Sequence, residues 1–239
     1  MGIANGDERQ IIRRTIVRHG HQTYMIMAGS CPRFAYTVGV SESVGAELVL
    51  AGAAIFTRDE VHVIINTVAT ELRAGTPAHT VVVVEGLGSF TLRRADPTWV
   101  RWLLCCANAY YRHDVAAYQI VPDRDHWTVD VPDMTTPWSV ESAPAWRFLR
   151  DLPPATFPAS AHVATGLDVL RGTLVTRATR REPSYWEAFS NAPLTMQQIR
   201  IVPLSTLLAT DESLVDLFDL PIGQRRWRPA SGHPWRRYM

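Results

Sequence analysis

Four side chains suited to acid–base chemistry lie on or beside short apolar segments in the first half of the chain. They are His19, Tyr36, Glu47 and Asp123. Histidine and glutamate are the usual general acids and bases, and a tyrosine hydroxyl can donate to a developing oxyanion. If these segments are neighbouring strands, the four side chains could line one pocket. We therefore take them as candidate catalytic residues.

A structural role is the alternative for the same residues. Buried polar groups at strand ends must be hydrogen-bonded whether or not any chemistry takes place there. Thr37 and Gln119 lie beside the candidates on the same segments, and we include them as candidate binding residues. We favour the structural alternative, since only proximity in space would turn these residues into a site.

Metal and cofactor signatures are weak. His19-x-His21 would place two rings on one side of an extended segment, but no third ligand follows at a fixed spacing. Asp123-x-Asp125 followed by His126 lacks the glycine and the glutamate of a calcium loop. The sequence also lacks the G-x-S-x-G, P-loop and H-E-x-x-H patterns. We expect no bound metal and no cofactor.

The composition is that of an ordinary soluble globular protein. Hydrophobic residues make up 46% and charged residues 20% of the 239 positions, which argues against a disordered chain. The formal net charge of +1 gives no overall attraction to nucleic acid or to a membrane. The three cysteines have no regular spacing, and the first residues lack the apolar segment of a signal peptide. We expect a cytoplasmic protein.

The apolar residues of the first half follow helical and strand spacings in turn. Thr57 and Glu60 form a capping box ahead of one helical run, and Asp96-Pro97 begins another. We expect helices over 11–17, from 57 and from 96, and strands over 22–27, 34–40, 47–51, 80–84, 89–92 and 115–121. This order predicts an α+β fold in which helices cover one face of a mixed or antiparallel sheet.

Seven prolines between residues 122 and 158 divide the chain. Such a stretch excludes a long helix or a central strand. We expect a flexible lead-in over 1–10, a first domain over 11–140, a Pro/Trp-rich linker over 141–157 and a smaller α+β domain over 158–239, with the boundary near 151–157. In the second half, strand patterns occur at 162–165, 174–177 and 199–203, and Asp211 can cap a short helix.

The tail over 224–239 combines five arginines with Trp227 and Trp235. Such a combination suits a single-stranded nucleic acid or an acidic protein partner. The alternative is a solvated surface on which the tryptophans pack back against the domain. We favour this alternative and keep Arg226 and Trp227 as candidate binding residues. The low net charge makes nucleic acid the less favoured partner.

Four motifs follow one another in the first half. They are His19-Gly20, the predicted strand Phe34-Ala35-Tyr36-Thr37-Val38-Gly39, the segment Glu47-Leu48-Val49, and Gln119-Ile120-Val121-Pro122-Asp123. Over about residues 10–140 this set resembles the bacterial domain-of-unknown-function family 4262. The family has His-Pro where this chain has Gly45-Ala46, so no role for that histidine carries over. Because the chemistry of the family is unassigned, the resemblance implies a domain but no reaction.

The second half carries a further set of features. They are Val169-Leu170, Arg180, Trp186, the segment from Pro203 to Leu208, and the segment from Asp211 to Gly223. Over about residues 158–235 this set is similar to domain-of-unknown-function family 2185, whose members include immunity-protein-like domains. The resemblance implies a small binding domain, and it makes Arg180 and Trp186 candidate binding residues.

We expect a two-domain bacterial protein that binds a protein partner, such as a toxin, and has no catalysis of its own. This expectation rests on the immunity-like resemblance and on the lack of a strong catalytic motif. The alternative is an enzyme of unknown reaction whose site lies at the motif strands of the first domain. An enzyme would require the four candidate catalytic residues to converge in one concave site. The oligomeric state is left open.

Overall fold

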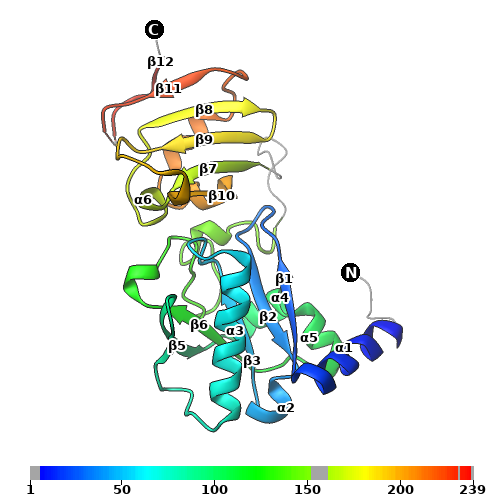
Figure 1. Cartoon of the computed structure of the whole chain (residues 1–239). Coiled ribbons are helices and arrows are strands. Elements are labelled where there is room, and N and C mark those ends of the chain that lie inside the picture. Colours follow the sequence, from blue (N-terminus) through cyan, green and yellow to red (C-terminus); the bar gives the residue numbers. More distant parts are fainter. Residues whose placement is uncertain (1–5, 152–160, 231, 238–239) are drawn as a thin grey trace.

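The computed structural model of the chain describes residues 6–151, 161–230 and 232–237. Within these residues the chain forms two mixed sheets of six strands each, and the sheets share no strand (Figure 1). The first sheet is built between residues 22 and 122, and the second between residues 162 and 237. The predicted α+β class is confirmed. None of the described helices is long and apolar enough to cross a membrane.

The first sheet contains a single parallel pair of strands. In spatial order its strands are β1 (Gln22–Ile26), β2 (Phe34–Val38), β3 (Glu47–Ala51), β6 (Ala117–Pro122), β5 (Gly88–Arg94) and β4 (Val82–Val84). Strands β3 and β6 are parallel, and the other neighbouring pairs are antiparallel. The sequence predicted all six strands, with ends that differ by no more than two residues.

Helices cover both faces of this sheet, whereas we expected them on one face. The helices are α1 (Gly6–His19), α2 (Ser41–Val44), α3 (Arg58–Arg73), α4 (Pro97–Leu103) and α5 (Cys105–Tyr111). Leu48 and Leu50 share a core with α3, while Val49 between them shares a second core with α1, α4 and α5. Successive strand residues point to opposite faces, so a run of consecutive apolar residues in β3 is buried from both sides.

The helix ends follow local chemistry, with two differences from expectation. Thr57 and Glu60 form the predicted capping box at the start of α3. The helix expected from residue 96 is divided at Leu104, which leaves the helical conformation with φ −96° and ψ 40°. Leu103 and Leu104 at this break are both buried. Helix α1 begins at Gly6, inside the expected lead-in over 1–10, whose first five residues lie outside the described part of the chain.

The proline-rich segment after β6 packs against the first domain. Trp146 is 1% exposed and belongs to the same core as Trp99. The Trp146 indole donates to the carbonyl of Asp130 at 2.8 Å, and the Trp99 indole donates to the carbonyl of Thr136 at 3.0 Å. The beginning of the expected linker over 141–157 is therefore part of the first core. The rest of it, from residue 152, lies outside the described residues.

The second sheet is covered by helices on one face. Its spatial order is β10 (Ile199–Pro203), β7 (His162–Gly166), β9 (Tyr185–Phe189), β8 (Arg177–Glu182), β11 (Arg225–Trp227) and β12 (Arg236–Arg237). The covering elements are α6 (Leu167–Leu170), α7 (Leu204–Leu208) and the 3-10 helix η4 (Glu212–Leu217), which share one core with Val163, Ala178 and Trp186. Strands β7 and β10 and the Asp211 cap agree with prediction. The strand expected at 174–177 begins instead at Arg177, and β9, β11 and β12 were not predicted.

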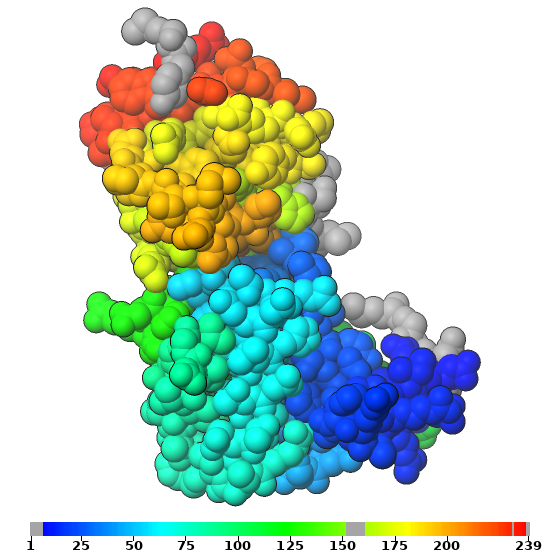
Figure 2. All heavy atoms as spheres, in the orientation of Figure 1, coloured from blue at the N-terminus to red at the C-terminus, as the bar shows by residue number. Residues whose placement is uncertain are grey.

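The two domains meet through side chains that bind backbone carbonyls. Arg200 of β10 donates to the carbonyl of Ala54 at 3.1 Å and to that of Ile55 at 2.9 Å. Ser205 donates to the carbonyl of Ser30 at 2.8 Å. Figures 1 and 2 show the second domain, in yellow to red, in contact with the first domain along this junction.

Gly52 lies where the first domain is most tightly packed near the junction. Its φ is +72°, and an added Cβ would lie 2.1 Å from the carbonyl oxygen of Asp130. Gly86 has a similar φ of +74°, but no atom lies within 4 Å of its Cβ position. Alanine substitutions at the two glycines therefore separate two contributions to the loss of stability. One is the strain of the backbone conformation, and the other is a clash with the backbone of another segment.

We predict that Gly52→Ala lowers the free energy of unfolding by about 2–5 kcal/mol, the sum of backbone strain and overpacking. Gly86→Ala should lower it by only about 1 kcal/mol, because strain alone applies. Urea denaturation of both variants measures the difference. Equal losses for the two variants would contradict the tight contact between Gly52 and Asp130.

Candidate functional site

Glu47 is the most enclosed of the candidate catalytic residues. Its side chain is 0% exposed at the start of β3. The carboxylate accepts hydrogen bonds from five donors: the Thr37 hydroxyl at 2.6 Å, the Tyr111 hydroxyl at 3.0 Å, and the backbone N–H groups of Gly39, Val40 and Ser41 at 2.9, 3.3 and 3.1 Å. Both carboxylate oxygens are thus engaged by the protein itself.

The neighbouring motif residues Thr37 and Gly39 help to hold Glu47 in place. Thr37 receives the N–H of Leu48 at 2.9 Å while it donates to Glu47. Gly39 has a φ of +113°, and an added Cβ would lie 2.7 Å from Ile16 of α1. The end of β2 therefore needs a glycine for two reasons, its backbone conformation and the close approach of α1. The carbonyl of Gly20 accepts from Arg73 of α3 at 2.9 Å.

The chemistry open to Glu47 is limited by its surroundings. Burial raises the pKa of its carboxyl above the ordinary value, while the Thr37 hydroxyl and the backbone donors oppose that rise. Burial and the charge of Glu47 likewise raise the pKa of Tyr111. A general base must reach a substrate proton, and a carboxylate with no exposed surface does not reach one in this conformation.

Tyr36 lies in a different environment from Glu47. Its hydroxyl oxygen accepts the N–H of Cys106 at 3.3 Å. Its ring stacks between Tyr24 and Phe34, with centroid distances of 5.4 and 6.1 Å. Burial raises the pKa of Tyr36, and the neighbouring Cys106 adds to the rise. The residue is 1% exposed and packs in the core that contains α1, α4 and α5.

Asp123 caps a short turn at the far end of the sheet. Its carboxylate accepts one hydrogen bond from the N–H of Ser89 at 2.7 Å and another from the ring nitrogen Nδ1 of His126 at 2.7 Å. The His126 ring stacks on Phe56 at 5.5 Å. Burial acts to raise the pKa of Asp123, but the hydrogen bonds from Ser89 and His126 outweigh it and hold the pKa below the ordinary value.

The predicted histidine pair does not form a metal site. His19 is exposed at the end of α1, whereas His21 is buried and its Nδ1 lies 3.3 Å from the Arg73 guanidinium. Burial lowers the pKa of His21, and the positive charge of Arg73 lowers it further. Within the described part of the chain, no three His, Cys, Asp or Glu side chains gather closely enough to hold a metal ion.

The four candidate catalytic residues do not meet. Glu47 pairs with Ala117 at the start of β6, and Asp123 follows the end of that strand. The six residue steps from Ala117 to Asp123 span about 20 Å at roughly 3.3 Å per step. Tyr36 binds Cys106, and His19 lies at the surface. Among the described residues, no hydrogen bond or ion pair joins any two of the four.

Gln119 has a structural role of the same kind. Its side-chain amide donates to the carbonyl of Pro132 at 2.7 Å, and its oxygen accepts the N–H of Met134 at 3.1 Å. The residue is 0% exposed. It therefore fixes the returning segment after β6 against the sheet, which a buried amide does well because it can donate and accept at once.

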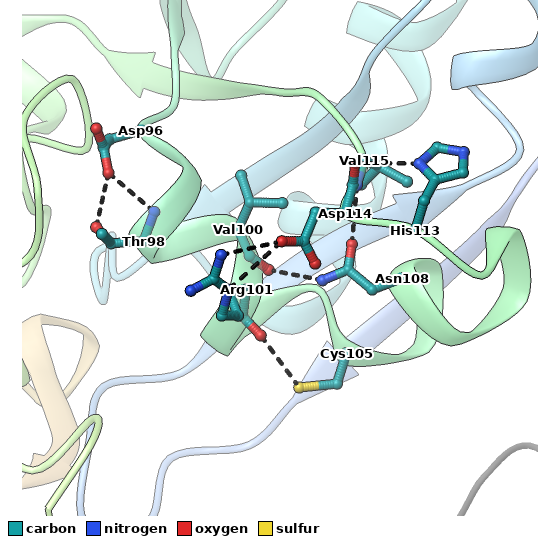
Figure 3. A network of polar contacts seen from close by, with 9 residues as sticks. All are labelled: Asp96, Thr98, Val100, Arg101, Cys105, Asn108, His113, Asp114 and Val115. Atoms are coloured by element: carbon teal, nitrogen blue, oxygen red, sulfur yellow. Dashed lines mark hydrogen bonds and ion pairs between the residues drawn. The ribbon is translucent and has the colours of Figure 1, made fainter.

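A polar network near the break between α4 and α5 is also structural (Figure 3). Asn108 donates to the carbonyl of Val100 at 3.2 Å and accepts the N–H of Val115 at 3.0 Å. It thereby ties both helices to the segment that enters β6. Arg101 and Asp114 form an ion pair at 3.3 Å beside it, but both side chains are at least half exposed, and such pairs contribute little.

A cavity of about 370 Å³ lies at the junction of the domains, between the loop before α3 and strand β10. Arg33 in its wall donates to the carbonyls of Ala53 and Phe56. Asp130 is fully buried and accepts the N–H of Ala54 at 3.1 Å, and burial raises the pKa of its carboxyl. Arg33 and Asp130 thus hold the loop over 53–56, while the buried Nε of Arg33 has no hydrogen-bond partner among the described residues.

Two candidate binding residues of the second domain, Arg180 and Trp186, lie on the side of its sheet that faces the core. The Arg180 guanidinium lies over the Trp186 ring, 4.7 Å from its centroid. Arg180 also donates to the carbonyls of Phe218 and Leu220 at 3.2 and 3.0 Å. Trp186 is 3% exposed. Arg180 holds the turn after η4 and is partly exposed, whereas Trp186 beneath it is buried.

A buried arginine of the tail was not singled out in the sequence. Arg228 is 2% exposed, forms an ion pair with Asp211 and donates to the carbonyl of Val175 at 2.9 Å. It also lies over the ring of Trp235 at 4.4 Å. The tail is therefore partly folded into the domain, as favoured from the sequence. The pairing of Asp211 with Arg228 spans too long a separation for a sequence pattern to indicate it.

The other two tail candidates lie on opposite sides of β11. Arg226 pairs with Ala178, which is buried in the second core, whereas Trp227 pairs with Arg177. Neighbouring residues of paired strands share a face, so Trp227 belongs to the face without helices and Arg226 to the core side. Arg236 of β12 lies over the Trp227 ring at 5.6 Å.

The uncovered face of the second sheet carries arginines that were not recognised. A hollow of about 270 Å³ on this face is lined by Arg177, Thr179, Arg181, Glu187, Phe189 and Arg225. In β8 the polar residues Arg177, Thr179 and Arg181 alternate, which is the spacing of one strand face. That spacing was the available signal, but the arginine-rich run was not recognised as a strand.

We predict that Glu47→Gln lowers the free energy of unfolding by roughly 1–3 kcal/mol. Glutamine has one acceptor oxygen, so at least one buried donor loses its partner at a cost of about 1–3 kcal/mol. Glu42→Gln on α2 is the matched control, because Glu42 is exposed. Urea denaturation measures both. A stable Glu47→Gln protein would mean that the five hydrogen bonds contribute little.

We predict that His21 makes the protein less stable as the pH falls below about 6.5. Its pKa in the folded protein lies below the unfolded value of 6.5, so the unfolded chain binds more protons in this window and stability decreases toward acid pH. His21→Gln keeps an acceptor for Arg73 and should flatten this part of the curve, while His79→Gln at an exposed position should not. The free energy of unfolding between pH 5 and pH 8 is the measurement, and unchanged curves for His21→Gln would contradict the prediction.

Comparison with known proteins agrees with the motifs of the first domain. Residues 15–128 match the family model described as domain of unknown function (DUF4262). No curated protein and no solved structure matches the chain. The matched region contains the whole first sheet and all contacts of Glu47. Residues 15–128, which make up most of the first domain, are therefore similar to the family of domains of unknown function DUF4262.

Proposed function

We propose that this chain is a non-catalytic protein that binds another protein through its second domain. The observation that carries the proposal is the uncovered face of the second sheet. Its opposite face is packed by α6, α7 and η4, whereas this face exposes Arg177 and Arg225 beside the partly exposed rings of Phe189 and Trp227. Arginines interleaved with aromatic rings are typical of protein interfaces.

The first domain supports this proposal as a scaffold. Arg200 and Ser205 bind its carbonyls and hold the second domain in place. The polar motif residues of the first domain are engaged in hydrogen bonds that hold its own segments together. No contact among the described residues favours the alternative of an enzyme site at the motif strands, which would need these groups to converge.

A toxin partner is a narrower form of the proposal. It derives from the resemblance of residues 158–235 to an immunity-protein-like family, which remains a prediction. The bacterial origin and the cytoplasmic location remain predictions as well. The proposal of a protein partner does not depend on them, since it rests on the exposed face of the second sheet.

The test is affinity capture with the tagged full chain from the organism that carries its gene. We expect one protein to be enriched in every replicate over a tag-only control, and to form a complex with the chain when both are purified. Repeated recovery of the chain alone would contradict the proposal. Analytical ultracentrifugation of the purified pair distinguishes a defined complex from non-specific capture.

A further inference from the structure

The uncovered face of the second sheet has a defined set of side chains. We call the part of it around the hollow, formed by β8, β9, β11 and β12, the arginine face. It consists of Arg177, Thr179, Arg181, Glu187, Phe189, Arg225, Trp227 and Arg236. The strand register places these residues together. Thr179 pairs with both Glu187 and Arg225, while Arg177 pairs with both Phe189 and Trp227. The two rows of paired residues lie side by side on the same face.

The charge of the arginine face is strongly one-sided. It contains four arginines and one glutamate, with a second carboxylate, Glu182, at its edge opposite Tyr185. The whole chain has a formal net charge of only +1. Glu187 is already paired with Arg181 at 2.7 Å. Among the described residues, no carboxylate pairs with Arg177, Arg225 or Arg236. Unpaired guanidinium groups around a hollow offer binding sites to carboxylates, which they hold in a planar, bidentate geometry.

We infer that the arginine face binds an acidic, extended segment of a protein partner. This inference rests on the proposed function and specifies its surface and its ligand chemistry. Side chains at alternate positions of an extended segment lie on one side, about 6.8 Å apart. Arg177 and Arg225 lie diagonally across the paired strands β8 and β11, a separation of about 7–8 Å, so carboxylates at alternate positions of the segment match these two arginines.

Nucleic acid fits the same face less well. Single-stranded nucleic acid is bound by stacking of bases on aromatic rings. Here the Phe189 ring is covered by Arg177 and the Trp227 ring by Arg236, each at 5.6 Å from the ring centroid. A second copy of this chain is disfavoured too, because two arginine faces would repel each other.

The test uses fluorescein-labelled octapeptides and the full chain. One peptide alternates glutamate with serine, and its control alternates glutamine with serine. We expect fluorescence anisotropy to detect binding of the glutamate peptide, weakened at high salt, and no binding of the glutamine peptide. A labelled oligouridine of the same length tests the nucleic-acid alternative. Failure of the glutamate peptide to bind, or tighter binding of the oligouridine, would overturn the inference.

Two variants test whether the peptide binds to the arginine face. The double variant Arg177→Gln/Arg225→Gln removes exposed charges from the arginine face, and we expect it to weaken peptide binding about tenfold. Arg226→Gln removes the same charge from the opposite side of β11 and should change affinity less than about twofold. Unchanged thermal melts verify that both variants fold. Equal affinities of the double variant and the wild type would overturn the inference.

The same variants separate this inference from the proposed function. If the double variant still captures the natural partner as well as the wild type does, the arginine face is not the surface used, although protein binding stands. If the wild type captures no partner, the proposed function itself fails. Loss of capture by the double variant, with capture retained by Arg226→Gln, supports both.

Discussion

The buried carboxylate of Glu47 is the interaction on which the first domain depends. A carboxylate without exposed surface is tolerated only when hydrogen bonds replace its lost hydration. Here Thr37, the backbone over 39–41 and Tyr111 supply them. These donors come from the end of β2, the start of α2 and the end of α5, so one side chain fixes the positions of three elements around β3. A motif that looks catalytic in the sequence is the polar centre of a fold.

The faces of the two sheets are covered to different extents. This difference distinguishes the first domain, which we take as a scaffold, from the second, which has an open face. In the first sheet, helices bury both sides of the central strands β2, β3 and β6, whereas β4 and β5 keep exposed residues such as Val83 and Thr91. In the second sheet, one side packs on short helices while the other carries arginines. The same residue type has two roles in this domain. Arg180 and Arg228 lie over tryptophans and bind carbonyls on the core side, whereas Arg177 and Arg225 extend from the open side.

Much of the first domain could be predicted because its signals are local. The capping box of α3 and the apolar runs of β2 and β3 lie within a few residues. The consecutive apolar residues Leu48, Val49 and Leu50 already indicated burial on both faces, although we expected helices on one. The Tyr111 contact with Glu47 joins residues far apart in the sequence and had no local signal. In the second domain, β8 is rich in arginine, and its strand character depends on neighbours that no local pattern reveals.

The parallel pairing of β3 with β6 has a consequence for folding while the chain is being synthesised on the ribosome. Strands β1, β2 and β3 follow one another closely and can associate as soon as they emerge. The edge of β3 that β6 will occupy must wait until residue 117 has been translated, a delay on the order of seconds. During that interval a nascent chain presents an apolar, unpaired strand edge to its surroundings. In that state the edge is available for pairing with another chain.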